Sequence, residues 1–337
     1  MIIRRQAIKI LKTVLLLFFS LFCLLAFLEI TSIVYVRITK EELPPLKESF
    51  DTAAHSLHLF DEELGFRLKP GYSFHDVRVN SLGFRSTQEF NFKTENKTII
   101  LLGDSMVFGV GISQDYIFSE LLNREHSTYR YINAGVIGYD TAQEYLVLKK
   151  YIDKIQPAAV ILFFEQSNDM LMNVRGDNFY PKASIQNGRL IIQKAIAENP
   201  FPFYQRFIFY QLMNTKMFKG RDLIYLYHKL MFTLFKERSE AWIVTKRLLF
   251  EIAELCDLNK AQLIIVDIPT QNQLKFPQLY SRETQKLLQE AAKERGIAYY
   301  DLMVHYPDWQ KLFIPRDSHW NIEGHRFMNE FVKKISE

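Results

Sequence analysis

The sequence has little cysteine: only Cys23 and Cys256 occur among its 337 residues. A fold stapled by several disulfide bonds is therefore excluded. The chain also lacks internal repeats and low-complexity tracts. Its composition is 48% hydrophobic and 24% charged, which excludes a disordered or fibrous chain. A chain of this length forms one large domain or two small ones.

An excess of charge of one sign is absent from the body of the chain. The first 40 residues carry six basic side chains against the single acidic Glu29, a net charge of +5, and the whole chain carries +4. The remaining residues therefore sum to −1. Nucleic-acid binding needs clustered positive charge that neutralises phosphates, so we predict no nucleic-acid partner.

The sequence has only one long hydrophobic run, residues 13–36, in which Glu29 is the only charge. A helix of about 20 such residues crosses the hydrocarbon core of a bilayer. Basic residues precede the run, which favours a cytoplasmic tail over residues 1–12 and places the rest of the chain across the membrane. We therefore predict a single-pass protein that contacts the bilayer through residues 13–36 and has an extracytoplasmic domain, periplasmic or at the cell surface.

Two other interpretations of this run are a cleaved signal peptide and a buried helix of a soluble protein. Cleavage lacks a small-x-small site, since Phe27, Leu28 and Glu29 occupy the expected region. A channel or transporter is disfavoured because the aromatic stretch 201–235 holds too many charged residues for a second span.

After a linker over residues 37–60, the pattern predicts alternating strands and helices in a domain over residues 61–337. Short apolar runs predict strands at 98–102, 129–133, 158–164, 262–268 and 297–301. Helical patterns lie at about 113–124, 140–155, 241–257, 280–295 and 322–336. This order predicts an α/β fold, a three-layer α/β/α sandwich around a mostly parallel sheet. Ligands of such sheets bind beyond the carboxyl ends of the strands.

Residues 175–240 interrupt the alternation and are rich in phenylalanine and tyrosine. We interpret them as an inserted, mostly helical subdomain, either a lid or an element packed on the core.

Polar residues follow the first three predicted strands. Ser105, in the string Gly103-Asp104-Ser105, stands where its hydroxyl and its backbone N–H lie at the carboxyl edge of the sheet; the alternative is a helix cap. Gly138 follows the second strand, where a glycine can offer an unobstructed backbone N–H to an anion. The alternative is that it belongs to an ordinary turn between strand and helix. Asn168 follows the third strand and offers a side-chain amide, or forms an Asn-Asp turn with Asp169.

A fourth string precedes the last helix and contains Asp317 and His319. A carboxylate two residues from a histidine can set the tautomer of the ring and stabilise its positive charge. A zinc site made by Asp317, His319 and His325 is the alternative, but neither a thiol nor further histidine spacing supports it. His325 by itself is interpreted as a structural residue.

In this order, the four strings resemble the SGNH hydrolases, also called the GDSL lipase/esterase family. The segment Val79-Asn80-Ser81-Leu82-Gly83-Phe84-Arg85 also looks like the entry segment of anchored or secreted members. The resemblance covers about residues 78–170 and 260–335, outside the 175–240 insertion. It implies a flavodoxin-like SGNH fold.

The resemblance also implies roles for these residues. Ser105 would be the nucleophile, His319 the general base and then acid, and Asp317 the residue that holds the histidine. The backbone N–H groups of Ser105 and Gly138 and the side chain of Asn168 would form the oxyanion hole. There are two departures from the pattern: Gln166 occupies a position that is usually glycine, and one residue rather than two separates Asp317 from His319.

The expected function is a serine esterase that removes an O-acyl group, such as acetyl, from an extracytoplasmic carbohydrate or other envelope component through an acyl-serine intermediate. No cofactor or metal is expected, and protein partners are not predicted. Two alternatives remain open at this stage: an O-acyltransferase that uses the same triad, and a non-catalytic glycan-binding protein with the same fold.

Overall fold

In a computed structural model of the full chain, the long apolar run lies within one helix, α1 (Ile2–Thr39). Residues Lys12–Thr39 have a mean hydropathy of 2.5, and the stretch is long and apolar enough to cross a membrane. Its polar side chains bond back to the helix: the hydroxyls of Thr31 and Ser32 donate to carbonyl oxygens of Phe27 and Leu28. Such bonds satisfy hydroxyl groups where water is absent. The helix belongs to one compact unit, and the α/β domain described below belongs to another.

The structure describes the following residues: 2–39, 57–90, 97–125, 128–166, 169–174, 180–195, 230–235, 238–277, 282–306, 308–315 and 317–337. The predicted Asn168 and most of the 175–240 insertion lie outside these ranges.

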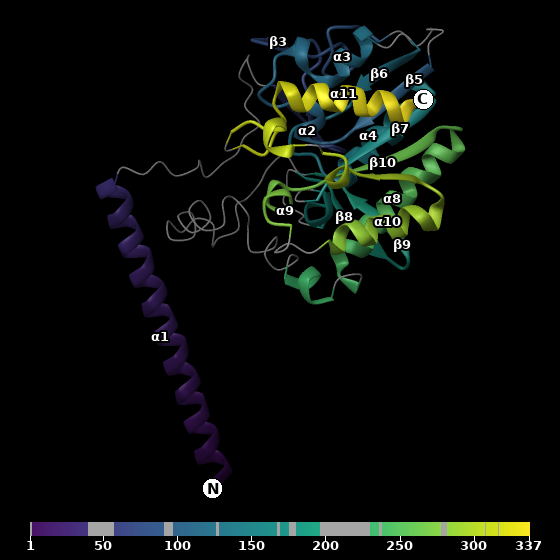
Figure 1. The fold of residues 1–337 in the computed structure, drawn as a ribbon. Helices are drawn as coiled ribbons and strands as arrows, with labels where there is room; N and C mark the ends of the chain where they lie inside the picture. Colours follow the sequence, from purple (N-terminus) through teal and green to yellow (C-terminus); the bar gives the residue numbers. More distant parts are fainter. Residues whose placement is uncertain are drawn as a thin grey trace. The chain divides into compact units, whose positions relative to one another are not determined.

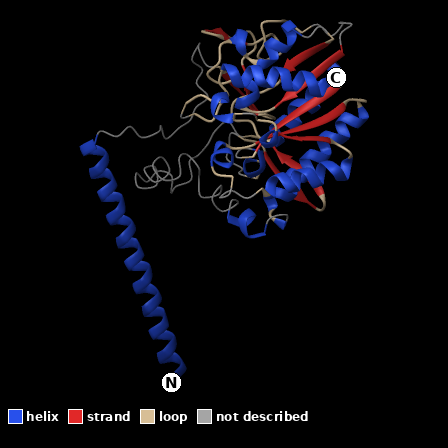
Figure 2. Cartoon of the chain, viewed as in Figure 1, coloured by secondary structure: helices blue, strands red, loops and turns tan. Residues whose placement is uncertain are grey.

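The α/β domain is built on one five-stranded sheet in the order β11-β10-β7-β5-β6, in which every neighbouring pair is parallel (Figures 1 and 2). The strands are β5 (Lys97–Leu102), β6 (Tyr129–Asn133), β7 (Ala159–Glu165), β10 (Gln262–Ile268) and β11 (Ala298–Asp301). Counted along the chain, this order is 2-1-3-4-5, as in flavodoxin-like sheets. The predicted three-layer α/β/α fold is confirmed.

Helices cover both faces of the sheet because successive strand residues point to opposite sides. Ile100 and Leu102 of β5 join one buried cluster, and Ile99 and Leu101 join the other. The first cluster is covered by the helices α4 (Thr141–Ile155), α8 (Glu240–Leu258) and α10 (Glu283–Arg295). The second is covered by α3 (Phe118–Glu125) and α11 (Ile322–Ser336). All five expected helical regions are present.

Two short hairpins precede the sheet. Strands β1 (His58–Asp61) and β2 (Gly65–Leu68) pair antiparallel, as do β3 (Ser73–Phe74) and β4 (Val77–Arg78). The first hairpin begins inside the predicted linker, and Phe66 and Leu68 belong to the core. Short helical elements complete the domain: α2 (Ser105–Phe108), η1 (Gln114–Tyr116), α5 (Asp169–Met172), α9 (Gln271–Lys275), η4 (Leu302–Val304) and η5 (Trp309–Leu312).

The expectation of a mostly helical insertion fails for part of residues 175–240. Strands β8 (Lys182–Gln186) and β9 (Arg189–Gln193) form an antiparallel hairpin there. Asn187 and Gly188 connect them, both with positive φ, as a tight two-residue hairpin turn requires.

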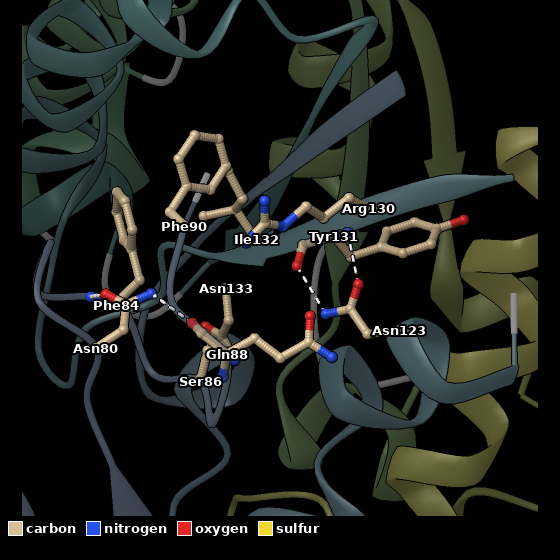
Figure 3. A pocket seen from close by; sticks show the side chains of 10 residues that line it. All are labelled: Asn80, Phe84, Ser86, Gln88, Phe90, Asn123, Arg130, Tyr131, Ile132 and Asn133. Atoms are coloured by element: carbon tan, nitrogen blue, oxygen red, sulfur yellow. Dashed lines mark hydrogen bonds between the residues drawn. The ribbon is translucent and has the colours of Figure 1, made fainter. Parts of the chain in front are cut away.

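The edge strand β6 is covered by a side chain. The Asn123 amide donates to the Tyr131 carbonyl and accepts from the Tyr131 N–H, each at 2.8 Å, as Figure 3 shows. These bonds replace those of a neighbouring strand, which reduces the risk of edge-to-edge pairing. The small pocket of Figure 3 lies beside this strand, and none of its lining residues is a predicted catalytic residue.

Candidate active site

Ser105 lies on a sharp turn from strand to helix. β5 ends at Leu102, and α2 begins at Ser105. The Asp104 side chain caps this short helix by accepting from the Met106 N–H at 2.8 Å. Gly103 is needed at the turn because a Cβ there would lie 2.3 Å from a methyl carbon of Val107. The turn places the Ser105 hydroxyl at the carboxyl edge of the sheet, half-buried.

His319 reaches the same edge from the loop before α11. Its carbonyl accepts from the Ile314 N–H at 2.9 Å, and an isolated β-bridge joins Phe313 to Trp320. These two backbone links fix the position of the histidine in the chain segment before α11. The ring Nε2 lies 2.9 Å from the Ser105 Oγ. Residues 214 positions apart are therefore within hydrogen-bonding distance.

Asp317 contacts the other ring nitrogen, with 2.6 Å between its Oδ1 and the His319 Nδ1. The same oxygen accepts from the His319 backbone N–H at 3.0 Å. Partial burial alone would raise the pKa of Asp317, but these hydrogen bonds lower it below its ordinary value. An ionised carboxylate only accepts, so Nδ1 carries a proton and Nε2 is left to accept from the serine hydroxyl. The one-residue spacing between Asp317 and His319 is thus compatible with this bond.

The loop that follows β6 packs directly on the serine helix. The Val136 N–H donates to the Gly103 carbonyl, and the Asn133 side chain donates to the Val107 carbonyl. A Cβ at Gly135 would lie 2.5 Å from the backbone nitrogen of Phe108, so only glycine permits this approach. Gly138, further along the loop, has φ of +82°. The structure therefore brings the Gly138 loop to the serine turn.

Gln166 belongs to a buried polar network at the end of β7. Its Nε2 donates to the Asp267 Oδ1 at 2.7 Å, and its Oε1 accepts from Gln273 at 2.8 Å. The Tyr299 hydroxyl donates to the other Asp267 oxygen at 2.7 Å. Burial raises the pKa of Asp267 to about 7, against the effect of the hydrogen bonds from Gln166 and Tyr299. The glutamine side chain is thus held by β10 and α9, and β11 holds its partner Asp267.

The zinc alternative is not supported by the described part of the chain, where no group of three or more His, Cys, Asp and Glu residues is arranged to hold a metal ion. His325 instead lies in the core, 1% exposed. Its Nδ1 accepts from the Phe118 N–H at 3.2 Å, and its ring stacks on that of Phe118. Burial and the nearby Arg85 lower the pKa of His325 to about 3, so the ring is neutral.

Arg85 is a residue of the site region whose role the sequence pattern did not indicate. Its guanidinium is 1% exposed and donates to the carbonyl oxygens of Phe108, Gly109 and Ile112 at 2.7–2.8 Å. Two of these carbonyls belong to the end of the serine helix. The segment Val79–Arg85 carries only the family resemblance, and the one local signal for Arg85 is its place directly after Gly83-Phe84.

Comparison with known proteins matches no family model and no curated protein. Among solved structures, the chain is similar to the esterase EstA from Pseudoalteromonas sp., with 13% identity, 71% of this chain and 96% of the other covered, and a TM-score of 0.43. It is similar to a lipolytic protein of the G-D-S-L family from Desulfitobacterium hafniense, with 14% identity, 71% and 99% covered, and a TM-score of 0.42. A lipase/acylhydrolase from Enterococcus faecalis gives 14% identity, 70% and 93% covered, and a TM-score of 0.40.

These neighbours are described as lipolytic and ester-hydrolysing proteins. In this chain, the contacts among Ser105, His319 and Asp317 are the observations that bear on chemistry.

Proposed function

We propose that the chain is a serine esterase in which Ser105, His319 and Asp317 form a catalytic triad. One observation carries the proposal: a continuous chain of hydrogen bonds joins the Ser105 Oγ to the His319 ring and that ring to the Asp317 carboxylate, at 2.9 and 2.6 Å. A serine hydroxyl is a poor nucleophile at neutral pH unless a base lies beside it. This arrangement disfavours the non-catalytic alternative, which has no use for a base at that distance.

In the proposed reaction the Ser105 Oγ attacks the carbonyl carbon of an ester while the His319 Nε2 takes the hydroxyl proton. The same proton then passes to the departing alkoxide, which leaves as an alcohol, and an acyl-serine remains. Water attacks this ester, giving a proton to Nε2, and the acid is released as the proton returns to Oγ. Asp317 keeps the ring oriented and stabilises the imidazolium.

The oxyanion hole is proposed to consist of the backbone N–H groups of Ser105 and Gly138 and the side-chain amide of Asn168. The N–H at the first residue of a helix has no intrahelical acceptor, which makes that of Ser105 available to a negative oxygen. The attachment of the Gly138 loop to the serine helix supports its part in the hole. The part of Asn168 rests on its place after β7.

The proposed substrate is an O-acyl ester, such as an acetyl ester, on an extracytoplasmic carbohydrate or envelope component. Helix α1 and the basic residues before its apolar stretch support a single-pass anchor in the bilayer with a cytoplasmic amino terminus and the α/β domain outside. The triad needs no metal or organic cofactor. Transfer of the acyl group to a sugar hydroxyl instead of water is the second candidate, since it uses the same acyl-serine.

A product analysis separates hydrolysis from transfer. The full chain in detergent is supplied with a short-chain acyl ester, with and without a glycan acceptor, and free acid and acylated glycan are measured. Hydrolysis predicts free acid at the same rate in both reactions. Acylated glycan formed at the expense of free acid would establish transfer instead, and no consumption of any short-chain ester would contradict both.

Asp317→Asn is expected to lower kcat/KM for a short-chain ester by about 10²–10⁴-fold. An asparagine amide offers the ring no carboxylate, so the tautomer with a basic Nε2 and the imidazolium are both disfavoured. Kinetics of the variant in the pH range 6–9 provide the measurement, with Asp308→Asn, an exposed carboxyl nearby in sequence, as the matched control. Equal losses in both variants would contradict a specific role for Asp317.

A further inference from the structure

Buried carboxyl side chains gather behind the serine turn. Asp104, Asp140, Glu144 and Asp169 are each 0–1% exposed. Each lies beside a segment that bears a proposed catalytic donor: Asp104 precedes Ser105, Asp140 and Glu144 begin the helix that follows Gly138, and Asp169 follows the Asn168 position. The cluster thus connects the three loops at the carboxyl edge of β5, β6 and β7.

Three of these carboxyl groups hold local backbone. Asp104 accepts from the Met106 N–H, and Asp140 accepts from the Gln143 N–H at 3.0 Å. Asp169 accepts from the Glu165 N–H, at the end of β7, at 2.6 Å. These bonds are of the kind that favours an ionised acceptor.

Glu144 is different. Both of its carboxyl oxygens are buried, and neither has a hydrogen-bond partner among the residues that the structure describes; the same holds for the second oxygen of Asp169. Two buried amide side chains of this region bond to other groups: Asn173 bonds to the Ala142 N–H and to Thr245, and Gln143 donates to the Leu64 carbonyl. An ionised carboxylate without donors or a cation is too costly to bury, and such a group takes up a proton instead.

The charges that act on Glu144 all favour the protonated form. Burial and the carboxyl groups of Asp104 on the serine turn and Asp140 on α4 raise the pKa of Glu144 well above its ordinary value. Burial, Glu144, Asp104 and Glu165 raise that of Asp169, while the Glu165 N–H opposes the increase. No basic group of the described residues is among these causes.

We infer that Glu144 is a positioning residue that carries a proton at neutral pH and, by keeping its carboxyl group neutral, allows the buried carboxyl groups of Asp104 and Asp169 to remain near one another after β5 and β7. A neutral carboxyl group adds no charge to the cluster, whereas an ionised Glu144 would repel the neighbouring carboxyl groups. The catalytic consequence rests on the proposed function, but the protonation of Glu144 does not.

Because Glu144 holds its proton more tightly in the folded chain than in the unfolded chain, its contribution to the free energy of unfolding decreases as pH rises. The pKa of Glu144 in the folded chain lies above that in the unfolded chain, so its contribution is complete below the unfolded value, near 4.3 for a glutamate, and is lost as pH rises toward the folded value. The raised pKa of Asp267, about 7, also makes the free energy of unfolding decrease as pH rises toward that value. The test therefore compares variants that all retain Asp267.

The experiment measures the Tm of the full chain in detergent between pH 5 and 9 for the wild type, Glu144→Gln and Glu290→Gln, an exposed control on α10. Glutamine is neutral at every pH and has nearly the same shape as a protonated glutamate. We expect Glu144→Gln to lose part of the downward slope and to exceed the wild-type Tm by roughly 3–6 °C at pH 8, while Glu290→Gln follows the wild type. A slope identical to that of the wild type, or a lower Tm at pH 8, would overturn the inference.

Two further measurements complete the test. The infrared carbonyl band of a protonated carboxylic acid is expected in the wild type at pH 8, above the range of Asp267, and is expected to be weaker in Glu144→Gln, where Asp169 is the other buried carboxyl group with a raised pKa; a wild type without the band would overturn the inference even if the variant failed to fold. Ester turnover is expected to fall at alkaline pH in the wild type and less in Glu144→Gln. An altered Tm slope in a chain that hydrolyses no ester would refute the proposed function and leave the inference standing.

Discussion

Replacement of Ser105 by alanine is expected to lower kcat for a short-chain ester by at least about 10³-fold and to leave the fold intact. The hydroxyl is the nucleophilic atom that the site places 2.9 Å from the His319 Nε2. Its loss removes the acyl-serine route, and the residual rate comes from whatever stabilisation the oxyanion donors provide to direct attack by water.

Steady-state kinetics of the full chain in detergent provide the measurement, and unfolding curves show whether the variant is folded. Ser113→Ala is a suitable control, because Ser113 lies in the same part of the chain and bonds to the exposed Asp76 carboxylate rather than to His319. A folded Ser105→Ala variant with undiminished turnover would remove Ser105 from the mechanism.

Replacement of Arg85 by methionine is expected to destabilise the fold by about 3–5 kcal/mol. Methionine retains much of the apolar stem but leaves the buried carbonyl oxygens of Phe108, Gly109 and Ile112 without their shared donor. Burial lowers the pKa of Arg85 to about 10, so the guanidinium is still charged at neutral pH, and its stack on the Phe108 ring at 4.6 Å is lost as well.

Urea unfolding of the full chain in detergent measures this loss, with Arg326→Met on the exposed face of α11 as the matched control. Arg85→Lys is expected to lie between the wild type and Arg85→Met, because an ammonium group cannot reach three carbonyl groups with the planar geometry of a guanidinium. An Arg85→Met variant as stable as the control would contradict the anchoring role.

The sheet could be predicted from the sequence because its strands are buried on both faces. Continuous apolar runs such as residues 159–164 leave few alternatives to a central parallel strand, and the predicted and observed strand bounds differ by no more than one residue. The meeting of Ser105 with His319 was expected from the resemblance of the four strings to the SGNH hydrolases, since His319 lies in the loop before α11 and not directly after a strand.

The hairpin at Lys182–Gln193 was missed although its signal was present. Asn187-Gly188 lies between short stretches of alternating polar and apolar residues, which is a strong local pattern for a two-residue turn.

The roles of Arg85 and Glu144 could not be read from the sequence. Each depends on contacts between segments distant along the chain: Arg85 with the carbonyls after Ser105, and Glu144 with carboxyl groups from two other loops. A charged residue in an amphipathic pattern is normally interpreted as exposed, and only the packed structure shows that these two are buried.

Labelling with a serine-reactive fluorophosphonate tests the central claim most directly. The folded chain is incubated with the probe, its intact mass is measured, and the modified residue is located by peptide mapping. We predict a single phosphonyl adduct on Ser105 that is absent in Ser105→Ala and forms far more slowly in His319→Ala. A folded wild-type chain that remains unlabelled, or that carries the adduct on a different residue, would contradict the assignment of Ser105 as an activated nucleophile.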